Sequence, residues 1–200
     1  MYLCSMVHQL EIKKSKREQI IEEAILLFKE KGYSATTVRD IADKVGMEAA
    51  SLYNHIKSKD DILKTICFDI ANTYRAHLEE VTSMKATPME KIKTLMRLQI
   101  SIITSNPASS LISNFEWKHL PDFERNIFIS ERKHYETVFK SLIEMAIAKG
   151  EMKAVNSSIA LYTILASVRW IDIWYKSERN ISPETLEETI SSIMLSGLEK

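Results

Sequence analysis

The segment from Thr36 to Asp61 constrains the fold more than any other part of the chain. It reads TTVRDIADKVGMEAASLYNHIKSKDD. Thr37 and Asp40 have the spacing of a capping box, so a helix is predicted to begin near Thr37. Apolar residues then recur at helical spacing until Gly46, which suits the left-handed conformation that ends many helices. The segment therefore predicts two short helices, a tight turn between them and the start of a longer third helix.

The second short helix has an outward face that suits the major groove of DNA. Leu52 and Ile56 lie four residues apart and are predicted to face inward, and Glu48 is predicted to cap the helix. The other positions are small, polar and nearly uncharged, whereas ordinary surface helices carry more charge. Such a face can lie deep in a groove only about 12 Å wide. A helix-turn-helix that reads double-stranded DNA is predicted; the alternative is a three-helix packing unit with a solvated face.

The predicted DNA contacts divide into base readers and phosphate binders. Ala49 and Ala50 are expected at thymine methyl groups, and Ser51 is expected to bond either base type. Asn54 is expected to pair with an adenine edge. Lys59 lies where the next helix begins, a position whose dipole also favours a phosphate. The remaining predicted DNA-binding residues, most of them phosphate contacts, are Thr36, Thr37, Arg39, Tyr53, His55 and Lys57.

Three sequence runs occur in order: IIEEAILLFKEKGY, TTVRDIA and VGMEAASLYNHIKSKDDIL. With these runs, residues 16 to about 67 resemble the DNA-binding domain of the TetR family of bacterial transcription regulators. Typical of that family are Gly-Tyr before Thr-Thr, Leu-Tyr in the recognition helix and Lys-Ser-Lys before the fourth helix. Two residues depart from the pattern. Ile56 stands where Phe is common, and Glu48, where Ser or Thr is common, places a carboxylate near phosphates and is expected to weaken binding.

Length and composition predict an all-α protein with two parts. The chain has 200 residues, of which 45% are hydrophobic, so it can bury a full core. Its four glycines fall at or near the ends of helical patterns, and no alternating strand pattern lies between them. We predict a flexible basic arm at 1–14, a three-helix helix-turn-helix domain at 15–64, and a helical ligand-binding and dimerisation domain at 65–200.

The charge balance requires a local rather than a global DNA-binding surface. The formal net charge is +0, which argues against a protein held to nucleic acid by bulk charge. Lys13, Lys14, Lys16 and Arg17 cluster ahead of the first predicted helix. We expect them to form an arm that reaches the duplex; the alternative is a solvated leader.

The cysteine usage and the N-terminus predict a cytoplasmic protein. Cys4 and Cys67 are too few for a disulfide framework and indicate free thiols. Residues 1–10 lack a basic leader before an apolar run, and the longest apolar stretch, 154–168, is interrupted by polar residues. No membrane partner is expected.

The second part is predicted to contain long helices and a self-association surface. A helix is expected over 58–81, followed by helices over 87–103, 109–119, 121–149 and 183–198. The helix after Asn156 has apolar residues on two faces, so it must be covered on two sides. One cover is expected to be a ligand pocket and the other a second copy of the chain. A homodimer through the last two helices would place two recognition helices on a palindromic operator.

A second, weaker resemblance concerns the ligand. The chain carries EW at 116, ERxxYE from 131, GE at 150, RWxxxWY from 169 and SGL from 196. This order is similar to that of TetR-family regulators that sense acyl-CoA thioesters. It implies a repressor released by a small apolar effector, an acyl-CoA or a fatty acid, that shifts the fourth helix. The alternative is that these aromatic residues are core and interface packing. The implied ligand-binding residues are Phe115, Trp117, Arg132, Tyr135, Arg169, Trp170 and Trp174.

Other function classes have less support. Glu116-x-x-His119 and Glu131-x-x-His134 have the spacing used by di-iron helix bundles, but a proline-containing segment of few residues separates them. No zinc-protease motif, phosphate loop or nucleophile elbow occurs. We therefore expect no enzyme, catalytic residue, metal or cofactor. An all-helical metal protein and a helical protein-interaction module are the alternatives.

Overall fold

The structure, a computed structural model, describes residues 14–175 and 181–198, and within these ranges it has helices and no strands. The all-α prediction is confirmed. The N-terminal part holds α1 (Lys16–Lys31), α2 (Val38–Val45) and α3 (Ala49–Leu52). The remaining elements are α4 (Lys59–Ser83), α5 (Pro88–Ser105), α6 (Pro107–Phe115), the 3-10 helix η1 (Trp117–His119), α7 (Asp122–Ala148), α8 (Ser157–Arg169), α9 (Ile171–Trp174) and α10 (Pro183–Ser196).

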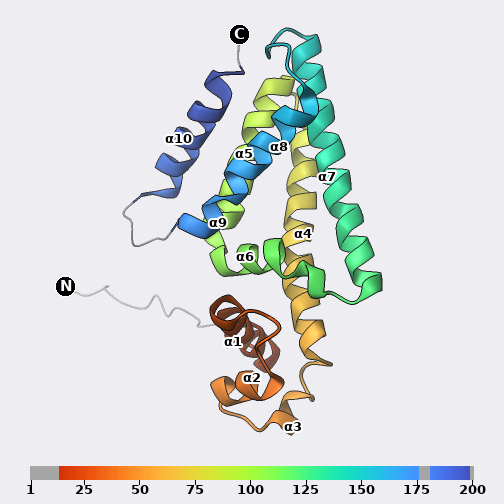
Figure 1. The fold of residues 1–200 in the computed structure, drawn as a ribbon, viewed down its shortest axis with the longest axis vertical. Coiled ribbons are helices and arrows are strands. Elements are labelled where there is room, and N and C mark those ends of the chain that lie inside the picture. Colours follow the sequence, from red (N-terminus) through yellow and green to blue (C-terminus); the bar gives the residue numbers. More distant parts are fainter. Residues whose placement is uncertain (1–13, 176–180, 199–200) are drawn as a thin grey trace, which may run out of the picture.

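Helix α4 joins two regions of the molecule: a first region with α1, α2 and α3, and a second region with the helices that follow α4. Figure 1 shows α1, α2 and α3 grouped at one end of α4, while α5 and α7 run beside its other half and α8 packs on both of them. Helix α6 crosses between the two regions and contacts both α1 and α4. No helix in the described ranges has the length and apolar character needed to cross a bilayer.

Local chemistry fixes the start and end of α2 as predicted. The Thr37 hydroxyl accepts a bond from the Asp40 backbone N–H at 3.1 Å, and the Asp40 carboxylate accepts one from the Thr37 N–H at 2.8 Å. The Asp40 carboxylate also accepts a bond from the Thr37 hydroxyl at 2.8 Å, and the two bonds that it accepts from Thr37 favour its charged form and lower the pKa of Asp40. Gly46 then ends the helix at φ 69° and ψ 43°, in the left-handed region.

The recognition segment differs from the prediction in two ways. Glu48 occupies the N-cap of α3, but its side chain makes no capping bond, so the predicted cap is wrong. Helix α3 also ends at Leu52. The N–H groups of Asn54 and His55 bond the carbonyls three residues earlier, which makes the segment a tight turn beyond α3.

The basic cluster at the N-terminus is divided. Lys16 and Arg17 belong to the first turn of α1 rather than preceding it. Arg17 Nη2 donates to Thr65 Oγ1 at 3.0 Å and lies 3.7 Å from the Asp61 carboxylate, so it ties α1 to α4. The predicted arm at 1–14, apart from Lys14, lies outside the described residues, as does Cys4.

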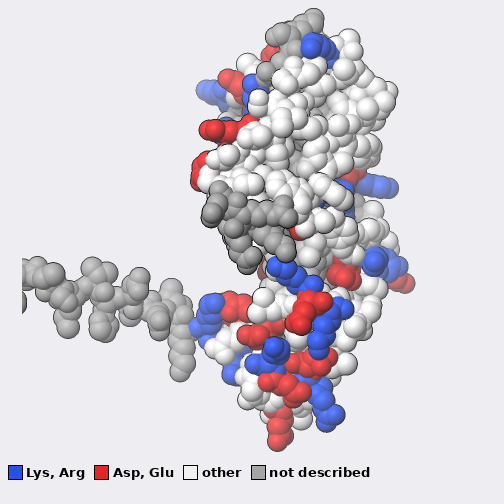
Figure 2. Space-filling model, turned by 60° about the vertical axis from the view of Figure 1, so that its left-hand side comes forward, with Lys and Arg blue, Asp and Glu red and all other residues white. Residues whose placement is uncertain are grey.

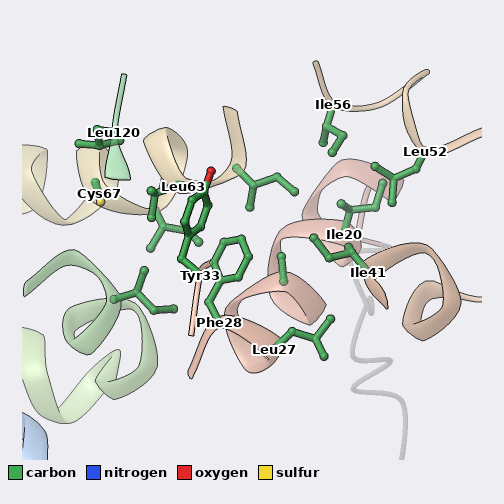
Figure 3. Close-up of a cluster of buried hydrophobic side chains, with 14 of the residues drawn as sticks. Ile20, Leu27, Phe28, Tyr33, Ile41, Leu52, Ile56, Leu63, Cys67 and Leu120 are labelled. Carbon is green, nitrogen blue, oxygen red and sulfur yellow. The ribbon is translucent and has the colours of Figure 1, made fainter. Parts of the chain in front are cut away.

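The core around the first three helices includes residues from the second half of the chain. Buried side chains of α1, α2, α3 and α4 form one cluster with Ile112, Leu120 and Phe128. Figure 3 shows Leu120 in the same cluster as Phe28 and Tyr33. Cys67 belongs to this cluster and is fully buried, and burial raises the pKa of its thiol to about 12. A separate cluster fills the space between α4, α5, α7 and α8.

Two helix boundaries in the second half depart from expectation. Pro121 is the N-cap of α7 rather than a residue of its first turn. The predicted continuous helix after Asn156 is interrupted at Trp170, which is both the C-cap of α8 and the N-cap of α9. The side chains on either side of Trp170 therefore do not continue the same helical faces.

Gly46→Ala is expected to destabilise the fold by about 1 kcal/mol, because the left-handed conformation places Cβ near the following carbonyl. An added Cβ would meet no other atom within 4 Å, so the cost comes from the backbone alone. Urea unfolding measures the change. Gly197→Ala is the control, since Gly197 has a helical φ of −77° and equally open surroundings. Equal effects of the two substitutions would contradict the assignment.

Candidate DNA interface and ligand pocket

Most of the predicted DNA-reading residues lie on the exposed end of the first region. The turn after α3 presents Tyr53, which is 55% exposed, together with Asn54, His55 and Lys57. Ala50 is also exposed, and Ser51 is partly so. Thr37 and Arg39 are exposed at the start of α2. Figure 1 places α3 at the far end of this region from the helical bundle, where a duplex has free access.

Two residues of the predicted set face the protein rather than the solvent. Thr36 is only 1% exposed, and its hydroxyl donates to the Gly32 carbonyl at 2.9 Å. Ala49 packs against the first core cluster and is partly buried. The expectation that the Thr36 side chain contacts DNA is therefore wrong in this geometry, because its hydroxyl is used within the domain.

Lys59 has internal partners instead of an open ammonium group. Its Nζ donates to the carbonyls of Tyr33 and Thr36, at 2.9 and 2.8 Å, and lies 4.2 Å from the centroid of the Tyr33 ring. These contacts hold the loop before α2 against the first turn of α4. The predicted phosphate contact is not what this geometry favours, because the ammonium is already bonded within the chain.

The surface charge of this region is mixed. Figure 2 shows Lys and Arg side chains interspersed with Asp and Glu over the N-terminal helices. The groove beside α3 is lined by Arg39, Asp43 and Glu48 together with small residues. Both signs are present there, so DNA affinity must come from a few placed contacts rather than from a uniform basic patch.

A cavity lies in the second region, between α4, α5, α6, α7 and α8. Its volume is about 70 Å³. Its walls combine apolar side chains with tyrosines, amides and charged groups. Of the predicted ligand-binding residues, Arg132, Tyr135 and Arg169 line it. Sequence reasoning missed several other lining residues, among them Tyr74, Arg75, Gln99, Asn114 and Phe128.

Four predicted ligand-binding residues do not line this cavity. Phe115 and Trp170 are 46% and 61% exposed. Trp117 packs against the first core cluster, and Trp174 packs against the cluster that includes Ile171. Their assignment to the cavity wall is wrong here, and for the two packed tryptophans the alternative of core packing holds.

Two tyrosines, Tyr74 and Tyr135, contribute hydroxyl groups to the cavity wall. Gln99 Nε2 donates to Tyr135 Oη at 2.6 Å, which fixes the tyrosine hydroxyl. Burial raises the pKa of both Tyr74 and Tyr135 above the usual range, so both are neutral hydroxyl donors. Tyr74 follows Ile62, Ile66 and Ile70 at four-residue spacing on one face of α4. A hydroxyl group on this otherwise apolar face could have indicated the cavity from the sequence.

The three arginines of the cavity differ in their partners. Arg169 Nη2 lies 3.7 Å from the Glu136 carboxylate, and Arg75 Nη1 lies 3.4 Å from that of Glu131. Among the residues that the structure describes, Arg132 has neither a carboxylate at ion-pair distance nor a hydrogen-bond acceptor. Its guanidinium lies over aromatic rings instead. Burial and the charge of Arg169 lower its pKa, but a guanidinium stays protonated.

The two Glu-x-x-His pairs have other roles in this structure. His119 Nε2 lies 3.4 Å from the Glu116 carboxylate on the same turn, and Glu131 faces Arg75. In the described ranges, no three His, Cys, Asp or Glu side chains are grouped to hold a metal ion. The geometry therefore gives no support to the di-iron reading.

The chain matches two family models. Residues 20–66 match the model for bacterial regulatory proteins of the tetR family, and residues 85–198 match that for a tetracyclin repressor-like C-terminal domain. The chain belongs to the TetR family. This membership confirms a helix-turn-helix transcription regulator that binds DNA.

Relatives of this TetR-family protein match over nearly its whole length. The HTH-type transcriptional repressor KstR2 of Mycolicibacterium smegmatis is 26% identical over 186 residues, which cover 92% of this chain and 91% of the relative. The fatty acid metabolism regulator protein of Bacillus subtilis is 23% identical over 189 residues, or 93% and 97% of the two chains.

Solved structures of TetR-family proteins share the fold. KstR2 of Mycobacterium tuberculosis, a ketosteroid transcriptional regulator, has a TM-score of 0.89 at 23% identity and covers 94% of this chain and 96% of its own. AibR, solved with isovaleryl coenzyme A and operator DNA, has a TM-score of 0.79 at 24% identity over 90% and 97%. At these identities the likeness shows the fold alone.

Lys59→Met is expected to lower the free energy of unfolding of this TetR-family protein by about 1–3 kcal/mol, because two carbonyls lose a charged donor. Lys57→Met is the matched control: Lys57 is exposed, so its stability change should stay within about 0.5 kcal/mol. Thermal unfolding of both variants measures the difference. If Lys59→Met were as stable as Lys57→Met, the structural role of Lys59 would be refuted.

Proposed function

We propose that this protein is a homodimeric repressor that binds a palindromic operator and is released by a small, largely apolar effector with an anionic group, an acyl-CoA or a fatty acid. The observation that carries the ligand class is Arg132. It is a guanidinium in the cavity wall with no carboxylate at ion-pair distance in the described chain. Such a group binds carboxylate or phosphate oxygens through charge-assisted hydrogen bonds.

The remaining walls suit the apolar part of such a molecule. Ile70, Leu78, Phe128, Leu165 and Val168 line the cavity. Two of the similar proteins support this class, since one is a fatty acid metabolism regulator and another was solved with isovaleryl coenzyme A. The cavity of about 70 Å³ is well below the roughly 300–1,000 Å³ of small-molecule sites. An effector must therefore move the walls apart, which gives binding a structural consequence.

The surface over α8 and α10 suits the predicted self-association. Ile159 and Tyr162 of α8 are 68% and 55% exposed, and Ile193 of α10 is 69% exposed. Figure 2 shows a broad face of the second region with few charged side chains. A self-complementary pairing of this face across a two-fold axis would cover these residues and set two helix-turn-helix units side by side.

The DNA contacts follow from the exposed set. Ala50, Ser51 and Asn54 would read base edges, while Thr37, Arg39, Tyr53, His55 and Lys57 would hold phosphates. Helix α3 and its turn present small or polar side chains, as a helix within the major groove requires. The basic arm, the domain boundary near residue 64 and cytoplasmic localisation remain predictions.

The test of this function is a binding selection on random duplexes with the full-length protein, repeated with palmitoyl-CoA and with free palmitate. Recovery of a palindrome that is lost on adding either compound would support both the DNA and the effector assignments, and the two probes separate the thioester from the acid. A palindrome unaffected by either would refute the effector class. Recovery of no sequence at all would refute the repressor.

Asn54→Ala is expected to relax base preference at one operator position, costing about 1–3 kcal/mol of discrimination there. Lys57→Met should instead weaken binding to specific and random duplexes alike and reduce the salt slope by about 1. Fluorescence anisotropy at several salt concentrations measures both effects. Equal losses on specific and random DNA for both variants would contradict this division of roles.

Arg132→Met is expected to weaken palmitoyl-CoA binding about tenfold or more, since a buried charged hydrogen bond contributes about 1.5–3 kcal/mol. Isothermal titration calorimetry measures the affinity. Arg75→Met is the matched control on the same wall, because Arg75 already faces Glu131 and should matter less. A larger loss for Arg75→Met would refute Arg132 as the anion-binding group.

A further inference from the structure

A continuous set of contacts leads from the cavity to the turn η1. The Arg132 guanidinium lies 5.6 Å from the Trp117 ring and 5.9 Å from the Phe128 ring. The two rings stack with centroids 6.2 Å apart and an interplanar angle of 26°. Arg132 and Phe128 line the cavity, whereas Trp117 is the first residue of η1. Any widening of this wall therefore acts directly on Trp117.

The other end of η1 touches the DNA-binding region. The His119 ring stacks on the Tyr33 ring at 5.4 Å and 24°, and His119 Nε2 lies 3.4 Å from Ser34 Oγ. Within the first core, Tyr33 packs edge-on against Phe28 at 5.1 Å (Figure 3). His119 is thus the only ring of η1 that meets the loop before α2 in the described chain.

Tyr33 is in turn bonded to both parts of the helix-turn-helix frame. Its hydroxyl donates to the Asp60 carboxylate in the first turn of α4. Its carbonyl, like that of Thr36, accepts from Lys59 Nζ. Thr36 immediately precedes Thr37, the N-cap of α2. A displacement of the Tyr33 ring would therefore shift the first residues of α2 and of α4.

We propose that η1 transmits effector binding to the helix-turn-helix, with Trp117 receiving the movement of Arg132 and Phe128 and His119 passing it to Tyr33. This rests on the proposed function, because it assigns the route by which occupancy of that cavity changes DNA affinity. Trp117 and His119 are positioning residues, since neither lines the cavity nor lies on the exposed DNA-reading turn. An anion that binds Arg132 draws its guanidinium off the two rings and frees Trp117 to move.

The geometry favours this route over movement of α4 alone. Helix α4 is shared by both regions and is held in the first core by Ile62, Leu63 and Ile66, all nearly fully buried. The turn η1 has three residues, and its N-cap Glu116 makes no side-chain capping bond. Packed cores resist small displacements, whereas the Trp117 and His119 side chains of η1 are only partly buried and are held less firmly than α4.

Amide hydrogen exchange on the effector-free protein tests the route without DNA or ligand. Arg132→Met removes the cation from Trp117 and should speed exchange about threefold at the hydrogen-bonded amides of His119, Leu120 and Thr36, as expected for one lost cation–π contact. Arg75→Met, on the same wall but without a ring contact to Trp117, should leave these amides unchanged. Unchanged exchange in Arg132→Met would overturn the proposal.

A second variant isolates the His119 step. In a His119→Ala background, Arg132→Met should still affect Leu120 but no longer affect Thr36, whereas His119→Phe keeps a ring and should restore the response. His119 is partly exposed, so its removal should leave the fold intact. An equal Thr36 response in the His119→Ala background would overturn the route.

Operator binding provides the functional measurement. In the wild-type protein, palmitoyl-CoA should change operator affinity by a factor within the usual range of about 5- to 150-fold. His119→Ala should bind palmitoyl-CoA with unchanged affinity while this factor falls towards one. Full retention of the factor would overturn the proposal and leave α4 as the route. Failure of wild-type protein to bind palmitoyl-CoA would count against the proposed effector, and the exchange results would still decide the route.

Discussion

The shared core beneath the helix-turn-helix is the interaction on which the rest of the structure depends. Three helices and the first turns of α4 cannot bury a large fraction of their apolar surface alone, because small domains bury proportionally less. Here Ile112, Leu120 and Phe128, from the second half of the chain, complete that core. The helix-turn-helix therefore packs on residues of the second region, and one of them, Phe128, also lines the cavity. A shared core couples the two regions, so a displacement in one can reach the other.

The cavity is connected to the core beneath the helix-turn-helix through Phe128. Phe128 belongs to the first core and also lines the cavity, so filling the cavity affects the packing of the DNA-binding region. A cavity of about 70 Å³ leaves the surrounding side chains less closely packed than in an ordinary protein interior. In the proposed function, occupation of the cavity would force a rearrangement, because protein interiors shift between discrete packings rather than deform smoothly.

Sequence alone was enough for the elements whose limits are set by local chemistry. Thr37 with Asp40, Thr87 with Pro88, and Gly46 each act through atoms a few residues away, and the helices begin or end there as predicted. Glu48 failed because an N-cap position does not guarantee a capping bond. The recognition segment proved shorter than its apolar spacing suggested, since that spacing places side chains on a face without fixing whether the bonds are α-helical or tighter.

The cavity walls were less predictable because periodicity assigns a side chain to a face but not to what that face meets. Trp117, Trp170 and Trp174 share the residue type expected of an acyl site, yet one enters the first core, one is exposed and one enters another cluster. Lys59 has the position of a phosphate contact, but the carbonyl of Tyr33, far away in sequence, accepts a hydrogen bond from its ammonium group. Only the tertiary structure brings those partners together.

The partners of the arginines were also not predictable from helical spacing, and they support the proposal that the cavity binds an anionic group. Helical spacing would pair Arg132 with Glu136, four residues later on α7. Glu136 instead faces Arg169 at 3.7 Å and accepts from the Tyr162 hydroxyl at 3.3 Å, both from α8. Arg132 is left against two aromatic rings, which offset only part of the cost of removing its charge from water. An anion entering this wall would regain that lost stabilisation, and this difference in free energy would favour the proposed response.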